Sequence, residues 1–128
     1  MNTQTVAGMI AGARSRIQNL SVGEVASELQ SGNVLLVDIR EPEERTANGT
    51  IPGAVPAVRG MLEFYADPTS PYHRPEFETD RRIVLACASG GRSALAADAL
   101  QQLGYNRVAH LDGGLKAWIA AGQPVETV

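Results

Sequence analysis

The stretch Ile83-Val84-Leu85-Ala86-Cys87-Ala88-Ser89-Gly90-Gly91-Arg92-Ser93 decides the fold. Its first four residues form an uninterrupted apolar run, which is typical of a strand buried on both faces of a parallel sheet. Small residues after Cys87 indicate a tight turn, and apolar residues at helical spacing predict a helix over 93–103 that Gly104 ends. The stretch therefore predicts a strand, a turn and a helix, with the chain's single cysteine at the carboxyl end of the strand.

Strands and helices alternate on both sides of this stretch. Apolar runs predict further strands over 34–37 and 107–111, and Ser21 with Glu24 forms a capping box that opens a helix ending near Gly32. A last helix is predicted to open at Gly113 and Gly114, a short one is expected over 60–66, and the proline-rich segment 67–80 predicts a loop. This alternation predicts an α/β fold with parallel strands and right-handed crossovers.

The 128 residues fit one domain, preceded by a short helical extension. Apolar residues at helical spacing between Val6 and Ile17 predict an amphipathic N-terminal helix. We therefore divide the chain into an extension over 1–16 and a domain over 17–128.

Composition excludes several kinds of partner. The net charge is −3, from 14 acidic and 11 basic residues, so we expect no basic face for nucleic acid. The longest apolar run, 83–88, is far too short to span a bilayer, and no basic cluster predicts membrane attachment. A single cysteine excludes an intrachain disulfide and, with no convincing secretory signal, predicts a cytoplasmic location.

The turn after Cys87 predicts a reactive thiol. The carboxyl edge of a parallel sheet is where ligands bind in α/β folds. Glycine-rich backbone can direct several N–H groups at one sulfur, and a helix N-terminus and Arg92 add positive charge, which together favour the thiolate. A buried, unreactive cysteine is the alternative. His73 and His110 have no partners at metal-ligand spacing, so no metal site is predicted.

Four motifs, in order along the chain, resemble those of the rhodanese-like sulfurtransferases. The active loop C-x-x-G-x-R resembles residues 87–92, and three further motifs of the family resemble Asp38-Ile39-Arg40-Glu41, Gly49-Thr50-Ile51-Pro52-Gly53-Ala54, and Leu111-Asp112-Gly113-Gly114 followed by Trp118. Thr50 replaces the family's usual histidine, at a position that we interpret as part of a turn.

The resemblance implies a single rhodanese-like domain with a five-stranded, mainly parallel sheet and helices on both faces. Cys87 would attack the outer sulfur of a small anionic donor such as thiosulfate, become a persulfide, and pass that sulfur to cyanide or a thiol, without a cofactor. The sulfur would be held by the backbone N–H groups of Ala88, Ser89, Gly90, Gly91 and Arg92. Arg92 would also help to bind the donor, or would form an ion pair that shapes the loop.

Other charged residues could complete the pocket. Asp38 and Arg40 follow a strand at the same sheet edge as Cys87, where an ion pair is their simpler interpretation. Arg59 and Glu63 begin the segment 59–80, which either covers the cysteine loop or is a surface excursion. We interpret Glu41, Glu43 and Glu44 as a solvated face.

Two other functions stay open. The fold could serve as a binding or regulatory module without turnover, or as a persulfide relay to a protein acceptor. Cysteine phosphatases use a C-x5-R loop, which surrounds a phosphate-sized anion, and here Arg92 comes one position too early for that loop.

Overall fold

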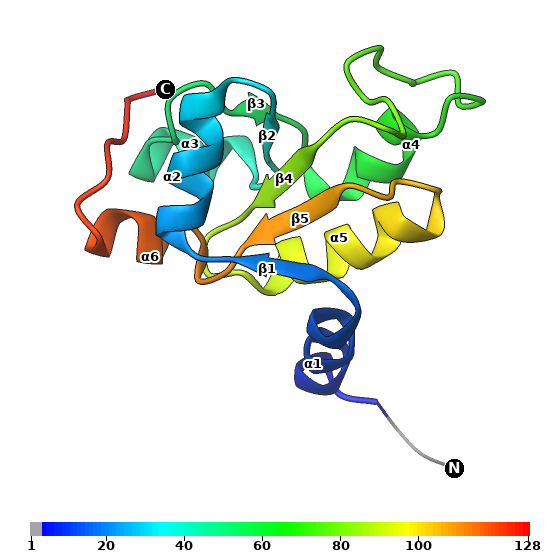
Figure 1. The fold of residues 1–128 in the computed structure, drawn as a ribbon, viewed down its shortest axis with the longest axis horizontal. Helices are drawn as coiled ribbons and strands as arrows, with labels where there is room; N and C mark the ends of the chain where they lie inside the picture. The colour runs from blue at the N-terminus through cyan, green and yellow to red at the C-terminus, as the bar shows by residue number, and fades with distance from the viewer. Residues whose placement is uncertain (1–3) are drawn as a thin grey trace.

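The computed structural model describes residues 4–128 and is built on one five-stranded sheet (Figure 1). Every strand pair in the sheet is parallel, which confirms the predicted α/β class. From one edge to the other the strands run in the order β1 (Gln18–Leu20), β5 (Val108–Leu111), β4 (Ile83–Ala86), β2 (Leu35–Asp38) and β3 (Val55–Pro56).

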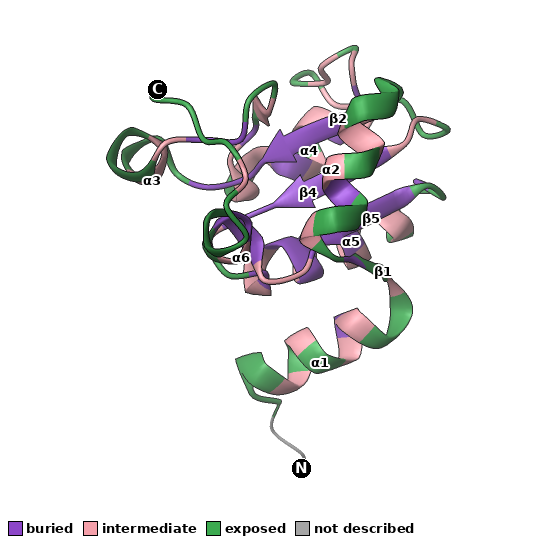
Figure 2. Cartoon of the chain, turned by 60° about the vertical axis from the view of Figure 1, so that its left-hand side comes forward, coloured by how far each residue is buried: buried purple, intermediate pink, exposed green. Residues whose placement is uncertain are grey.

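Helices cover both faces of the sheet because successive residues of the central strands point in opposite directions. In β4, Ile83 and Leu85 pack into the hydrophobic cluster that includes α4 (Leu62–Ala66) and α5 (Gly91–Gln102). Val84 and Ala86 pack into the cluster on the other face, which includes α2 (Val22–Ser31) and α6 (Gly114–Ala120). The inner strands are therefore buried along their whole length (Figure 2).

The N-terminal helix α1 (Val6–Arg16) packs against α5 at the side of this core (Figures 1 and 2). Ala13 is its buried residue, and a β-carbon on Gly91 would lie 3.2 Å from the side chain of Ile10. The predicted helix therefore exists and reaches the start of α5, directly after the cysteine loop.

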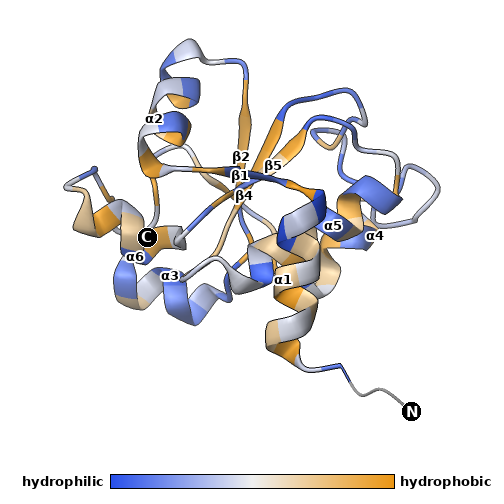
Figure 3. Cartoon of the chain, turned by 60° about the horizontal axis from the view of Figure 1, so that its bottom comes forward, coloured by the Kyte–Doolittle hydropathy of each residue, from blue (hydrophilic) through white to orange (hydrophobic). Residues whose placement is uncertain are grey.

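Three elements differ from the sequence expectations. Helix α3 (Pro42–Asn48) was not predicted, because none of its residues is buried and most of them are hydrophilic (Figure 3). The strand β1 was also missed, since it is only three residues long, whereas β3 lies at the end of the segment 51–56, which the sequence indicates as a turn leading into a short extended stretch. Helix α5 begins at Gly91, two residues before the predicted start, so the turn after Cys87 is shorter than the sequence predicts.

Most of the segment 59–80 lies away from the cysteine loop. Residues Arg59–Met61 form a 3-10 turn that continues into α4. The loop over 67–80 then lies beside the start of β4, whereas Cys87 follows the other end of the same strand (Figure 1). Phe77 anchors this loop in the core, so the surface excursion is the correct alternative for 67–80.

Candidate active site

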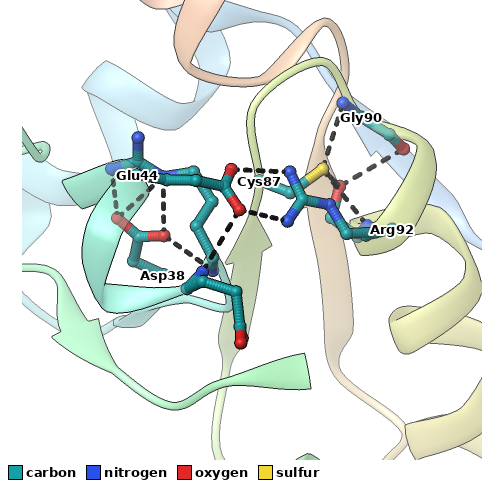
Figure 4. Close-up of polar contacts among 8 residues, drawn as sticks. Asp38, Glu44, Cys87, Gly90 and Arg92 are labelled. Atoms are coloured by element: carbon teal, nitrogen blue, oxygen red, sulfur yellow. Dashed lines mark hydrogen bonds and ion pairs between the residues drawn. The ribbon is translucent and has the colours of Figure 1, made fainter. Parts of the chain in front are cut away.

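Cys87 lies directly after β4 and its side chain is buried, with the residue only 1 % exposed. Two backbone groups donate hydrogen bonds to its sulfur, the N–H of Gly90 at 3.1 Å and the N–H of Ser93 at 3.4 Å (Figure 4). Both belong to the start of α5, whose N-terminal end carries partial positive charge. The sulfur therefore accepts hydrogen bonds from two main-chain N–H groups at the start of a helix, an arrangement that can stabilise negative charge.

The set of donors differs from the predicted one. Among the five residues expected to hold the sulfur, 88–92, the backbone of Gly90 makes the direct hydrogen bond in this structure. The second donor is Ser93, which was not among the residues predicted to hold the sulfur. Early entry into α5 explains this change, because it turns the N–H of Ser93 back toward the strand end.

The first turn of α6 closes the cysteine loop from outside. The backbone N–H of Leu115 donates to the carbonyl of Cys87 at 2.9 Å, and the N–H of Lys116 donates to that of Ala88 at 3.0 Å. Gly114 makes this approach possible, because it adopts a φ of 63° and a β-carbon there would lie 2.6 Å from both carbonyl oxygens. Gly114, in the last of the four sequence motifs, therefore packs directly against the backbone of the cysteine loop.

We expect Gly114→Ala to destabilise the fold by roughly 3 kcal/mol, from left-handed strain of about 1–2 kcal/mol and overpacking of about 1–3 kcal/mol. The matched control is Gly32→Ala, where φ is 81° but no atom lies within 4 Å of the added carbon. This control should lose only the strain energy. Urea unfolding of both variants tests the prediction, and equal losses in the two would contradict the close packing of Gly114 on the loop.

Arg92 is held by a bidentate ion pair with Glu44 of α3. Its two terminal nitrogens donate to the carboxylate at 2.7 and 2.9 Å (Figure 4). The Arg92 hydrogen bonds lower the pKa of Glu44, and the same hydrogen bonds raise the pKa of Arg92. The interpretation of Glu44 as a merely solvated residue was wrong, and the pair braces the cysteine loop against α3.

Asp38 and Arg40 form a buried ion pair, as their simpler interpretation predicted, with 2.7 Å between the charged groups. The hydroxyl of Thr50 donates to Asp38 at 3.0 Å, and Arg40 also donates to the carbonyl of Gly49 at 2.7 Å. Thr50 therefore has a structural partner, in agreement with its interpretation as part of a turn. The network fixes the chain on both sides of α3, the helix that supplies Glu44.

Arg40 also borders a small cavity beside the loop. The cavity has a volume of about 180 Å³ and is lined by Arg40, Asn48, Ala88, Leu115, Lys116 and Ile119. The cavity therefore lies between Arg40, a residue of the predicted pocket, and Ala88 of the cysteine loop.

Arg59 and Glu63 pair with each other at 2.7 Å across one turn, where both side chains are partly exposed. Within residues 4–128, no hydrogen bond or ion pair joins either of them to residues 87–92. Their predicted place in the pocket stays a prediction.

A buried polar chain behind Cys87 was not predicted. The Cys87 sulfur lies 3.5 Å from the hydroxyl oxygen of Ser93, that oxygen lies 2.8 Å from Nδ1 of His110, and Nε2 lies 2.7 Å from Oδ1 of Asn19. Burial lowers the pKa of His110 to about 4, so the imidazole is neutral at physiological pH. The signal in the sequence was a histidine inside an otherwise apolar buried strand, β5, next to the strand that carries Cys87.

Within the part of the chain that the structure describes, no group of three or more His, Cys, Asp or Glu residues is arranged to hold a metal ion. No helix over the same residues is both long and apolar enough to cross a bilayer.

Comparison with known proteins identifies relatives over most of the chain. A sulfurtransferase of Allochromatium vinosum is 41 % identical over 93 residues, which cover 73 % of this chain and 78 % of that protein. The mouse thiosulfate sulfurtransferase/rhodanese-like domain-containing protein 3 is 32 % identical, over 75 % of this chain and 64 % of its own length.

Solved structures share the fold. The protein RPA3614 of Rhodopseudomonas palustris, described as a possible tyrosine phosphatase, is 44 % identical with a TM-score of 0.93, covering 98 % of this chain and 97 % of that one. The human single-domain sulfurtransferase TSTD1 is 28 % identical with a TM-score of 0.69, covering 80 % and 95 %. The model of the rhodanese-like domain matches residues 21–121. The chain therefore belongs to the rhodanese-like domain family, and its five parallel strands and flanking helices are that family's fold.

Proposed function

We propose that this protein is a sulfurtransferase that carries a sulfur atom on Cys87. The observation that supports this most is the pair of backbone N–H groups, of Gly90 and Ser93, aimed at one buried sulfur. Such donors stabilise negative charge on sulfur, both on the attacking thiolate and on the persulfide that follows. Relatives that are named sulfurtransferases support the same activity.

The proposed reaction has two half-reactions with thiosulfate as donor. In the first, the Cys87 thiolate attacks the outer sulfur of thiosulfate, the sulfur–sulfur bond of the donor breaks, and sulfite leaves with the bonding electrons. In the second, cyanide or a thiolate attacks the outer sulfur of the persulfide, and Cys87 leaves as a thiolate. Oxidation states balance without a cofactor, because the sulfur atom is passed from one nucleophile to another.

The surroundings of Cys87 favour a small donor. The residue is 1 % exposed, and the residues that follow it, Ala88, Ser89, Gly90 and Gly91, carry small side chains or none. Helices α3 and α6 flank this loop, through the Arg92–Glu44 ion pair and the hydrogen bonds of Leu115 and Lys116, and we propose that they limit access to an anion of a few atoms. We therefore propose thiosulfate or a similar small anion as donor.

Steady-state kinetics test the proposal. With thiosulfate and cyanide varied together and thiocyanate measured, we expect parallel double-reciprocal lines, because sulfite leaves before cyanide binds. Intersecting lines would contradict the covalent intermediate. A complete lack of thiocyanate with every donor would instead favour the binding module.

An aryl phosphate is the control substrate, because one structural neighbour is described as a possible tyrosine phosphatase. We expect no hydrolysis. Arg92 is already paired with Glu44, and the loop between Cys87 and the start of α5 at Gly91 is too small to surround a phosphate group. Phosphate release at the expense of sulfur transfer would overturn the proposed reaction.

A further inference from the structure

The orientation of Asn19 fixes the proton on His110. The side-chain NH2 of Asn19 donates to the carbonyls of Arg14 at 3.0 Å and Ile17 at 3.4 Å. Its oxygen therefore faces Nε2 of His110 at 2.7 Å. An amide oxygen only accepts hydrogen bonds, so Nε2 carries the hydrogen.

The neutral imidazole then determines the direction of the Ser93 hydroxyl. With hydrogen on Nε2, Nδ1 of His110 is an acceptor, and Ser93 donates to it at 2.8 Å. The competing acceptor, the carbonyl of Gly90, is farther away at 3.3 Å. Because the hydroxyl has one hydrogen, its oxygen presents a lone pair to the Cys87 sulfur at 3.5 Å, where it accepts from the thiol.

We propose that Ser93 and His110 form a relay that removes the proton of Cys87 as its sulfur attacks. The S–H bond breaks and its proton passes to the oxygen of Ser93. The original hydroxyl proton of Ser93 passes at the same time to Nδ1 of His110, which leaves a thiolate, an intact hydroxyl and an imidazolium. After the shift Ser93 donates to the negative sulfur, alongside the N–H groups of Gly90 and Ser93.

Burial is the main factor that disfavours protonation of His110, while the charged groups near the relay are paired with one another. Arg14 of α1 disfavours protonation of His110 and Asp112 favours it, and these two residues form an ion pair at 2.9 Å. Beside Cys87, the charge of Arg92 is paired with Glu44. The thiolate itself, two hydrogen bonds away, then supplies the charge that stabilises the imidazolium, as expected for coupled groups.

This relay deepens the proposed function, on which its role in sulfur transfer rests, but its test needs no sulfur donor. Alkylation by uncharged iodoacetamide reports the proton loss alone. Ser93 and His110 move the Cys87 proton and do not contact the sulfur donor, so the informative readout is the shape of the pH profile. An alkylation pH profile that contradicts the relay, together with normal thiocyanate formation, would leave the proposed function intact. The expected pH profile without any thiocyanate formation would leave the relay intact and contradict the proposed function.

The first variant is His110→Asn, which keeps an acceptor near the Nδ1 position but has no basic nitrogen. The second is Ser93→Ala, which removes the hydroxyl through which the proton passes. We expect the rate of wild-type alkylation to stay nearly constant from about pH 8 to about pH 5, where His110 can still accept a proton. Both variants should be slower by roughly tenfold or more near about pH 6, and should match the wild type at alkaline pH. Slowing by the same factor at every pH, or unchanged rates, would overturn the relay.

Asn19→Asp provides a second test at a less buried position. A carboxylate facing Nε2 stabilises the imidazolium, so this variant should alkylate faster than the wild type at acid pH. Slower or equal alkylation would contradict the relay. In a His73→Gln background, His110 is the sole histidine, and its ring nitrogen resonances should show hydrogen on Nε2 in the resting protein. Hydrogen on Nδ1 would overturn the assigned direction.

Discussion

Replacement of Cys87 by serine is expected to abolish thiocyanate formation from thiosulfate and cyanide. The hydroxyl occupies the same place but is a far weaker nucleophile than a thiolate, and no second cysteine is available to replace it. Loss of a covalent route should lower the rate by at least about 10³-fold, to the uncatalysed background. The measurement is steady-state thiocyanate formation at saturating donor.

Stability serves as the control for this variant. Cys87 accepts hydrogen bonds from two backbone N–H groups, and a serine oxygen can accept from the same groups, so the fold should persist. Thermal unfolding within a few degrees of the wild type would confirm this. A folded Cys87→Ser protein that still turns over would show that the nucleophile is assigned to the wrong residue.

Replacement of Arg92 by alanine is expected to lower kcat/KM for thiosulfate by about 100-fold, which corresponds to roughly 3 kcal/mol for charge-assisted hydrogen bonds to an anion. The loss should fall mainly on KM for thiosulfate, while the second half-reaction with cyanide changes little. This expectation follows from the position of Arg92 at the rim of the cysteine loop, with its side chain 40 % exposed. Initial rates at varied thiosulfate concentrations measure it.

Glu44→Gln separates the two roles of Arg92. This variant keeps the guanidinium charge for a donor but weakens the bidentate pair that braces the loop against α3. If Arg92 binds the donor, the Glu44 variant should lose much less activity than the Arg92 variant. Equal losses in both would mean that the brace alone explains the effect, and that Arg92 does not bind the donor.

The parts of the fold with strong periodicity were predictable from the sequence. The strands β2, β4 and β5 contain only two polar residues, Asp38 at the end of β2 and His110 in β5. The capping box of Ser21 and Glu24 opens α2 as predicted. These local signals positioned Cys87 at the carboxyl edge of the sheet, because a parallel strand and its following helix leave few other arrangements.

Contacts between distant segments were not predictable. Glu44 lies on a short hydrophilic helix, and its pairing with Arg92 joins residues 48 positions apart. The contact between Ser93 and His110 depends on the neighbouring positions of β4 and β5 and on the early start of α5. A single sequence contains the residue types for both contacts but no measure of their distance.

The division of the chain at residues 16 and 17 stays a prediction, as does the cytoplasmic location. Helix α1 ends at Arg16 and the edge strand β1 begins at Gln18, so the proposed boundary falls between two elements. The family match begins at residue 21, yet Asn19 contacts His110 and Arg14 pairs with Asp112 beside the site. The segment before the matched region therefore contributes contacts to the surroundings of Cys87.

The mass of the intact protein, measured after incubation with thiosulfate and removal of excess donor, tests most directly whether Cys87 carries a sulfur atom. We predict that the wild type gains one sulfur atom, located on Cys87 by fragmentation, and loses it when cyanide is added. The Cys87→Ser variant should gain none. An unchanged mass of the wild type with every small sulfur donor, or an added sulfur on any other residue, would contradict the account.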